Sequence, residues 1–356
     1  MPAYDAFLLL SFGGPEGPDD VLPFLENVTR GRGVPAERLA EVAEHYYAAG
    51  GVSPINGQCR EMIAAIEAAG IGLPVYWGNR NWRPFLTDTV RRMAGDGVER
   101  AIAFVTSAYS SYSACRQYRD DIEAAVAAVE ASGARAPRID KIRPYFNHPG
   151  FIEPFAASAE TALATLPPGA AAGARLVFTA HSVPVGMAAA SGSVSAGTVV
   201  PGGRYVAELR EASRLISERT RRGSLPWDLV FQSRSGPPSV PWLEPDVTDH
   251  LRTLAKDGVP AAVVVPAGFV SDHMEVVHDL DTDAAETAAS LGMGFARAAA
   301  PGPAPRFARM VCELVAERAA GAPALALGGF GPAAGDCPAD CCRYARPARP
   351  ARPARP

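Results

Sequence analysis

Short runs of apolar residues, many of them β-branched, alternate along the chain with longer stretches in which apolar positions recur every three or four residues. The runs at 6–10 (AFLLL), 101–105 (AIAFV) and 261–265 (AAVVV) contain no polar position, which is the pattern of strands buried on both faces. Strands of this kind that alternate with amphipathic helices are typical of α/β proteins with parallel sheets.

The chain nearly repeats this pattern. The segment AFLLLSFGGP (6–15) aligns with RLVFTAHSVP (175–184), and residues 75–108 align with residues 230–269. In both halves a strand ends in a polar loop with an arginine, a turn rich in Trp and Pro follows, and a helix ends at DGV before a buried strand. Such an internal repeat predicts two similar doubly wound lobes, of the Rossmann or flavodoxin-like type.

We expect the first lobe to span 3–145, the second to span 175–300, and a closing helix to lie within 303–330. Open parallel sheets bind ligands at the carboxyl ends of their strands. The repeat places Phe12 and His181 at matching strand ends, so two facing lobes would enclose a cleft suited to a flat, large ligand. The loop SFGGPEG lacks the spacing of a dinucleotide fingerprint, so we do not expect nucleotide binding.

The densest cluster of polar groups is SDHMEVVHDLD (271–281), directly after a predicted strand. Asp272 can cap a helix that starts there. Three carboxylates then recur every four residues on one face of that helix: Glu275, Asp279 and Asp283. Like charges at this spacing are mildly destabilising, so the row indicates a cation or a water-filled channel, or else a solvated outer face. His273 and His278 fall on other faces and are expected to be structural.

A neutral histidine and a carboxylate from facing strand ends can bind a divalent metal or move protons. His181 and Glu275 are the candidates for this pair, although a histidine at a strand end is often only structural. Tight structural metal sites usually take four protein ligands. We therefore expect a weak, transient metal site in the cleft.

The composition narrows the class of partner. The chain has 356 residues, 20% of them charged, a net charge of −4 and a pI near 5.9, which argues against a nucleic-acid partner. No apolar run reaches the ~20 residues that a membrane-spanning helix needs, and the N-terminus lacks the basic region of a signal peptide. We expect a cytoplasmic monomer without stable membrane insertion. The final ARPARPARPARP (345–356) predicts an extended, disordered tail.

Five long motifs, in order, resemble the ferrochelatase family and its actinobacterial branch: LLLSFGGPEGPDDVLPFLENVTRGRGVP, HYYAAGGVSPINGQ, VFTAHSVP, FQSRSGPPSVPWLEPD and GFVSDHMEVVHDLD. The resemblance covers about residues 6–310. It implies a two-lobed class II chelatase that inserts ferrous iron, as a substrate, into a porphyrin held in the interlobe cleft.

The actinobacterial likeness implies coproporphyrin III as the porphyrin, and Arg30 and Arg32 would suit its four propionates. Both arginines would equally serve protoporphyrin IX. Two further functions stay open: a chelatase for cobalt or nickel, and a porphyrin carrier or iron–sulfur sensor without catalysis.

The resemblance also implies roles for individual residues. His181 and Glu275 match the pair that contacts iron or accepts the pyrrole protons, and Asp279 and Asp283 match an acidic row proposed as a metal path. Four positions match porphyrin contacts or the surroundings of the propionates: Ser53, Tyr118, Arg30 and Tyr46. Phe12 stands where some bacterial relatives have an iron-ligating tyrosine. Phenylalanine cannot ligate iron, but it can pack against the macrocycle.

The segment GDCPADCCRY, within 331–344, places Cys337, Cys341 and Cys342 close together near the C-terminus. Three close cysteines and one distant partner form a framework for an iron–sulfur cluster. Cys115 matches the family's distant ligand, so the resemblance implies a 2Fe-2S cluster on these four cysteines. Two of them are adjacent here, which departs from the family's spacing, so zinc binding and free thiols stay open as well.

Overall fold

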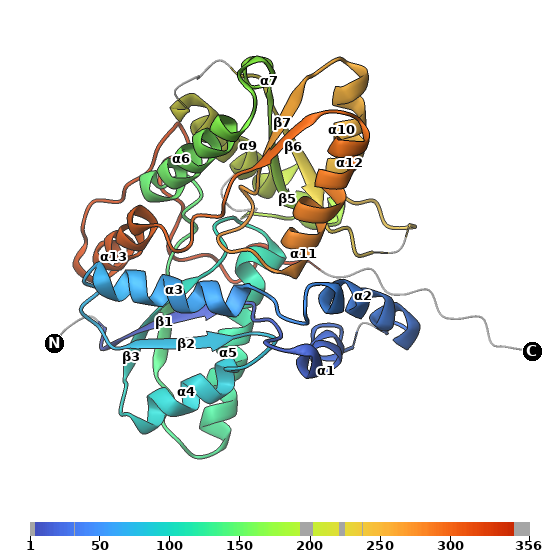
Figure 1. The fold of residues 1–356 in the computed structure, drawn as a ribbon. Helices are drawn as coiled ribbons and strands as arrows, with labels where there is room; N and C mark the ends of the chain where they lie inside the picture. The colour runs from blue at the N-terminus through green and yellow to red at the C-terminus, as the bar shows by residue number, and fades with distance from the viewer. Residues whose placement is uncertain (1–3, 32, 193–201, 221–224, 237, 345–356) are drawn as a thin grey trace, which may run out of the picture.

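The continuous apolar runs form the central strands of two parallel sheets in the described part of the chain (Figure 1). The first sheet has the order β2-β1-β3-β4 and the second has the order β6-β5-β7-β8. The strands are β1 (Ala6–Ser11), β2 (Val75–Asn79), β3 (Arg100–Val105), β4 (Arg138–Lys141), β5 (Arg175–His181), β6 (Trp227–Gln232), β7 (Ala261–Val265) and β8 (Gly294–Arg297). Every residue of β1 and β7 is buried, because helices cover both faces of each sheet.

The computed structural model describes residues 4–344 with gaps at 32, 193–201, 221–224 and 237. Arg32 and the predicted tail at 345–356 therefore lie outside the described residues.

The two sheets repeat each other, as the sequence predicts. Leu8 of β1 pairs with Tyr76 of β2 on one side and with Ala103 of β3 on the other. Phe178 of β5 pairs in the same way with β6 and with β7. The predicted α/β class with two similar parallel-sheet lobes is confirmed.

The helices around the first sheet are α1 (Pro18–Val28), α2 (Ala36–Ala48), α3 (Ile55–Ala68), α4 (Leu86–Gly95), the π-helix η1 (Tyr112–Arg116) and α5 (Gln117–Ala131). Helices α4 and α5 bury one face of this sheet through a cluster that includes Leu8, Val90 and Ile122. Helix α3 lies on the other face, and α1 and α2 project beside the sheet (Figure 1).

The helices of the second half are α6 (Pro149–Thr165), α7 (Pro168–Ala172), α8 (Val185–Ala189), α9 (Gly203–Arg219), α10 (Val247–Lys256), α11 (Met274–Val276), the π-helix η3 (Val277–Ala284), α12 (Ala285–Ser290) and α13 (Pro305–Ala320). Helices α10, η3 and α12 cover the outer face of the second sheet, while α6 and α9 lie on its inner face. No helix among the described residues is long and apolar enough to cross a membrane.

One hydrophobic core joins the two sheets. It runs from Leu9 and Phe104 in the first sheet, through Phe155 of α6, to Phe178 and Val263 in the second. Helix α13 packs against both α6 and α3. The lobe boundaries at 145 and 175 stay a prediction, since the core itself is continuous.

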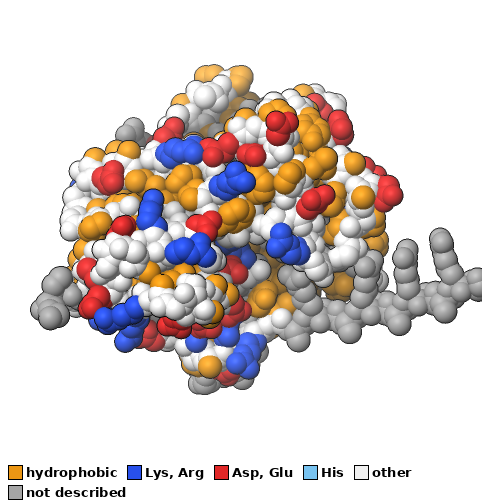
Figure 2. All heavy atoms as spheres, turned by 90° about the horizontal axis from the view of Figure 1, so that it is seen from below, with side chains coloured by type: hydrophobic (Ala, Val, Ile, Leu, Met, Phe, Trp, Pro, Cys, Tyr) orange, Lys and Arg blue, Asp and Glu red, His pale blue; other side chains and the backbone are white. Residues whose placement is uncertain are grey.

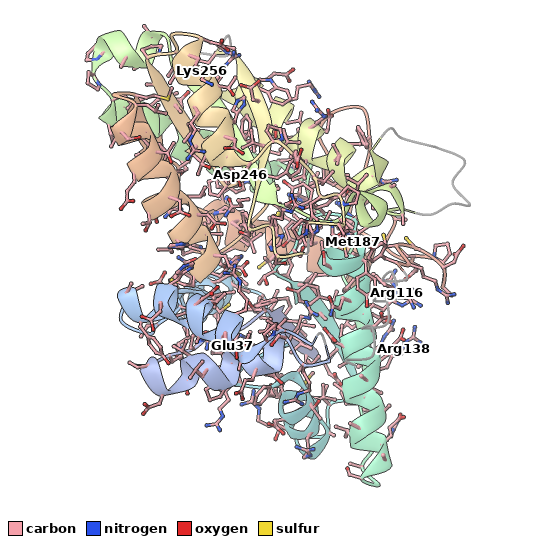
Figure 3. All side chains as sticks on the ribbon, turned by 90° about the vertical axis from the view of Figure 1, so that its right-hand side faces the viewer. Glu37, Arg116, Arg138, Met187, Asp246 and Lys256 are labelled. Carbon is pink, nitrogen blue, oxygen red and sulfur yellow. The ribbon has the colours of Figure 1, made fainter. Side chains whose placement is uncertain are left out.

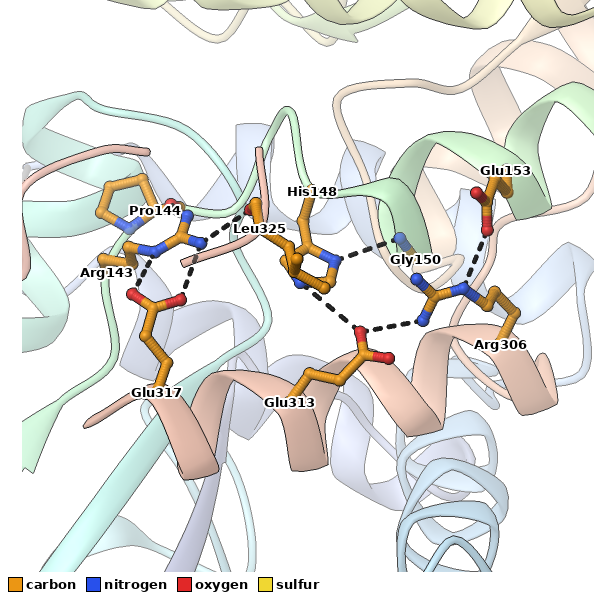
Figure 4. Close-up of polar contacts among 9 residues, drawn as sticks. All are labelled: Arg143, Pro144, His148, Gly150, Glu153, Arg306, Glu313, Glu317 and Leu325. Carbon is orange, nitrogen blue, oxygen red and sulfur yellow. Dashed lines mark hydrogen bonds and ion pairs between the residues drawn. The ribbon is translucent and has the colours of Figure 1, made fainter. Parts of the chain in front are cut away.

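The connection between the sheets is fixed to α13 by a buried ion pair and by the contact of a neutral histidine (Figure 4). Arg143 donates two hydrogen bonds to Glu317, at 2.7 and 2.9 Å, and its side chain is only 3% exposed. His148 caps α6 by accepting from the amide of Gly150 at 3.0 Å. Burial lowers the pKa of His148 to about 3, so this ring is neutral beside Glu313. Two side chains of the segment that links the lobes therefore hold it against α13.

Charge is evenly mixed on the face seen in Figure 2, where acidic and basic side chains are interspersed. This agrees with the small net charge of −4. No single sign of charge dominates that face.

Candidate functional site

The structure brings the predicted pair together at the strand ends of the second sheet. His181 is the last residue of β5, and its Nε2 lies 3.4 Å from Oε2 of Glu275 in α11. β7 ends at Val265, and the chain then turns through Ala267 into the segment that carries Glu275. The two side chains thus meet at the carboxyl edge of the sheet, where parallel sheets place ligands.

The hydrogen bonds of His181 set which nitrogen can react. Nδ1 contacts the carbonyl oxygen of Ser182, and because a carbonyl only accepts, Nδ1 carries the hydrogen. The neutral ring therefore has its lone pair on Nε2, and once Nε2 takes up a proton it can donate that hydrogen to Glu275. Burial lowers the pKa of His181, but the hydrogen bond to Glu275 and its negative charge raise the pKa by more than burial lowers it. The pKa of His181 is therefore above its usual value. The ring remains 34% exposed, so a ligand can reach it.

Aromatic rings surround this pair. His273 lies 4.0 Å from Glu275 and stacks near Phe12, with ring centroids 6.4 Å apart. Burial lowers the pKa of His273. The hydroxyl of Tyr46 is buried, and burial together with the charge of Glu275 raises its pKa. Phe12 and Tyr46 both pack against Phe24, so they share one aromatic wall.

The helix start differs from the prediction. His273, not Asp272, occupies the N-cap position, and Asp272 accepts no amide of this helix. Its carboxylate instead accepts from Arg297 at 3.0 Å and from Gln58 at 3.4 Å. The assignment of Asp272 as a cap was wrong, because its partners come from distant parts of the chain.

The three carboxylates of the row lie on α11 and the following π-helix, each in a different setting. Asp279 accepts hydrogen bonds from Ser233 and Gln232, and burial raises its pKa to about 6. Asp283 lies 3.7 Å from Nε2 of His278, whose ring stacks on His45 of α2 at 3.8 Å. The row thus runs from an exposed end at Asp283 to the His181 pair.

The polar loop after β2 carries an arginine, Arg80, which lies near Phe12 of this aromatic wall. The Arg80 guanidinium is 4.6 Å from the ring of Tyr118 and 5.9 Å from that of Phe12, and it pairs with Asp121. The sequence could have indicated this, because Arg80 directly follows β2 at the carboxyl edge of the first sheet. Its neighbour β1 ends there at Ser11, one residue before Phe12.

The remaining predicted porphyrin positions lie in the first lobe. Arg30 is exposed and lines a polar cavity of about 220 Å³, together with Asn27, Arg80, Asn81, Gln117 and Asp121. Ser53 is buried against Gly14, where an added Cβ would lie 2.7 Å from the Ser53 side chain. Ser53 therefore helps to hold the glycine loop, and Tyr118 is buried in α5 beneath Arg80.

The four predicted cluster cysteines line one cavity of about 250 Å³, between η1 and the C-terminal segment: Cys115, Cys337, Cys341 and Cys342. The Sγ atoms of Cys341 and Cys342 are 3.7 Å apart. The contact with Cys341 lowers the pKa of the Cys342 thiol, and the amide of Gly192 acts in the same direction. Across the described ranges, no three His, Cys, Asp or Glu side chains are placed to hold a metal ion.

This cavity lies near the junction of the lobes. Ser113 of η1 contacts the Met187 sulfur of α8 at 3.7 Å, and Figure 3 labels Met187 and also Arg116, the last residue of η1. Arg116 also donates to the carbonyl of Ala339. The C-terminal segment is thus bonded to η1, the helix that contains Cys115.

Comparison with known proteins identifies the group to which this architecture belongs. The ferrochelatase family profile matches residues 4–319. The coproporphyrin III ferrochelatase of Streptomyces griseus is 54% identical, over 97% of this chain and 94% of the relative. That of Nocardia farcinica is 57% identical over 88% of each chain. The ferrochelatase of Rhodopirellula baltica is 51% identical over 97% and 95%.

A solved structure shares the fold at low identity. SirB from Bacillus subtilis with Fe³⁺ aligns with a TM-score of 0.52 and 11% identity, over 88% of this chain and 95% of SirB. The profile match and the close relatives cover nearly the whole described chain. The chain belongs to the ferrochelatase family.

Proposed function

We propose that this chain is a coproporphyrin III ferrochelatase, which exchanges the two pyrrole protons of the porphyrin for one ferrous ion. The observation that carries the proposal is the His181–Glu275 pair, 3.4 Å apart at the strand ends of the second sheet. Family membership supports the reaction class, and the relatives named coproporphyrin III ferrochelatase support the substrate.

The pair suits removal of the pyrrole protons. Nε2 of His181 accepts a proton, since Nδ1 is already bonded to the Ser182 carbonyl, and Glu275 stabilises the imidazolium that forms. Asp279, with its pKa near 6, can take up that proton close to neutral pH and pass it outward along the row to Asp283. The same carboxylates can carry the incoming cation in the opposite direction.

The porphyrin would lie against the aromatic wall of Phe12 and Tyr46, opposite His181. Binding energy at this wall can hold the macrocycle in a nonplanar shape that exposes its nitrogens. Arg30 would pair with propionates at the polar cavity, where Arg80 supplies a second cation. Four propionates would use such cations more fully than the two of protoporphyrin IX.

Metallation rates measured separately with the two porphyrins test the substrate assignment. Purified wild-type chain is given ferrous iron anaerobically with coproporphyrin III or protoporphyrin IX, and Arg30→Ala is compared. We expect faster metallation of coproporphyrin III, and a several-fold rise in its KM in the variant. Preference for protoporphyrin IX contradicts the substrate assignment and keeps the reaction. Porphyrin binding without turnover would instead indicate a carrier.

We further propose that Cys115, Cys337, Cys341 and Cys342 hold a 2Fe-2S cluster. Four thiols around one cavity match the type and number of ligands of such a cluster. Each iron of a 2Fe-2S cluster binds only two thiolates, so the cluster does not require three side chains that converge on one metal ion. When bound, such a cluster would supply one-electron chemistry, which metallation in the cleft does not require. The monomeric state and the cytoplasmic compartment stay predictions.

The cluster is tested by its composition. Anaerobically purified holoenzyme should contain about two irons and two acid-labile sulfides per chain. Cys115→Ser should lose both, while Cys59→Ser, at a buried thiol in α3, should retain them. Bound zinc, or no metal, in the wild-type protein would contradict the proposal.

A further inference from the structure

We propose that Tyr205 is a positioning residue for His181, a role that rests on the proposed function of that histidine. Tyr205 lies near the start of α9 and is 5% exposed. Its hydroxyl donates a hydrogen bond of 3.0 Å to the main-chain carbonyl of His181. Tyr205 therefore acts on the backbone that carries the imidazole and does not itself reach the reacting atoms.

The His181 carbonyl depends on this donor. Carbonyls alternate sides along a strand, so His181 points its carbonyl to the same side as Thr179, toward β7. The pairing of β5 with β7 ends at Phe178 and Val265, and the amide of Gly268 takes the Thr179 carbonyl. His181 lies three residues beyond Phe178, where the neighbouring strand β7 has already ended. The Tyr205 hydroxyl replaces the missing strand amide.

The peptide between His181 and Ser182 is held from two sides. On the β6 side, the Ser182 amide donates to Gln232 at 2.7 Å and its hydroxyl donates to Leu243 at 2.8 Å. On the opposite side, Tyr205 binds the His181 carbonyl. The Ser182 carbonyl fixes the hydrogen of His181 on Nδ1, so any rotation of this part of the backbone weakens the bond that keeps Nε2 ready to accept a proton.

Tyr205 is itself fixed by its surroundings. Its amide donates to the Ser191 hydroxyl at 2.8 Å. Its ring meets Tyr109 edge to face, at 6.2 Å and 86°. Tyr109 in turn donates its hydroxyl to the Ala267 carbonyl at 2.7 Å, in the turn that leads to Glu275. The donor is therefore rigid, as a positioning group must be.

The test compares Tyr205→Phe with a matched control. Tyr145→Phe removes another buried hydroxyl, which donates to the main-chain carbonyl of Val105 at 2.9 Å and not to the His181–Ser182 peptide. Both variants lose one buried hydrogen bond, so both should lower the melting temperature to a similar extent. The full chain is labelled with ¹⁵N-histidine, and the tautomer of His181 is read by NMR well above the imidazole pKa, with His181→Ala for assignment.

We expect the Nδ1–H tautomer to dominate in the wild-type chain and in Tyr145→Phe, and a mixture of tautomers in Tyr205→Phe. The kcat for coproporphyrin III should fall about tenfold in Tyr205→Phe alone, with KM nearly unchanged, because the imidazole is misplaced and the porphyrin wall is intact. Equal tautomers, or an equal kcat, in the two tyrosine variants would overturn the proposal. A wild-type chain that metallates no porphyrin would refute the proposed function, while the tautomer comparison would still decide the role of Tyr205.

Discussion

Asp279 is the residue whose charge the fold controls most clearly. It lies between Glu275 and Asp283 in the acidic row and accepts hydrogen bonds from Ser233 and Gln232. Burial raises its pKa from 3.8 to about 6, although the Ser233 hydrogen bond opposes this shift. The folded chain thus keeps a carboxyl that changes charge near neutral pH, at the middle of the proposed proton path.

This shift makes a prediction for stability. Because the folded pKa is raised, the stability that Asp279 contributes is complete below pH 3.8 and is lost as the pH rises through about 6. Asp279→Asn should therefore raise the free energy of unfolding near neutral pH by about 3 kcal/mol at most, and by much less near the pH where the free carboxyl titrates. Urea unfolding over a range of pH measures the difference, with Asp249→Asn on the surface of α10 as the control. A gain that is independent of pH would contradict the raised pKa.

The sequence predicted the residues of this site better than their settings. The pairing of His181 with Glu275 followed from the strand repeat and the family motifs. The environment of Asp279 could not be predicted in this way, because its partners Gln232 and Ser233 lie at the end of a different strand, β6. Asp272 was misassigned for the same reason. Its partners Gln58 and Arg297 are distant in sequence, and a capping rule considers only residues next to the helix start.

At the scale of elements, the docking of α13 on the interlobe connection depends on a buried ion pair. The Arg143 side chain is 3% exposed and binds Glu317 through two nitrogens (Figure 4). Arg143 also donates to the carbonyls of Pro144 and Leu325, so its hydrogen-bonding groups are directed into the protein. A buried cation of this kind becomes costly when its carboxylate is removed.

Glu317→Ala should lower the free energy of unfolding by about 3–5 kcal/mol, because Arg143 is left buried without its counterion. Chemical denaturation measures the change. Glu41→Ala removes the partner of Arg38 in an exposed pair, with both side chains 63% exposed, and should cost no more than about 1 kcal/mol. Similar losses in the two variants would show that α13 is held by other contacts.

Element types were readable from the pattern, but local helix geometry was not. The repeat of apolar strands and DGV turns predicted the two parallel sheets. The polar stretch after Ser271 was expected to be an ordinary helix, and the structure has a π-helix over Val277–Ala284. Residues four apart lie near one another on either kind of helix, so the spacing of the carboxylates could not distinguish them.

At the scale of the whole molecule, the two lobes share one core. The hydrophobic cluster passes without interruption from Leu9 in the first sheet to Val263 in the second, through α6. The sequence repeat predicted two lobes but could not show that their inner faces are joined, because that contact depends on how the sheets are arranged in space.

A shared core predicts cooperative unfolding of both lobes. Trp77 and Trp82 lie in the first half, and Trp227 and Trp242 lie in the second. Variants that keep only the first or only the second tryptophan pair, with phenylalanine at the other two positions, should give coincident denaturation curves by fluorescence. Two separated transitions would show that the lobes unfold independently.

The most direct test of the central claim is the anaerobic rate of iron insertion into coproporphyrin III by His181→Ala and by His250→Ala. His250 of α10 pairs with Asp228 of β6 at 3.0 Å and serves as the matched control. We predict that His181→Ala loses at least about 100-fold in kcat, because it removes the proton acceptor, while His250→Ala stays close to wild type. Equal rates in the two variants would contradict the assignment of the His181–Glu275 pair as the centre of metallation.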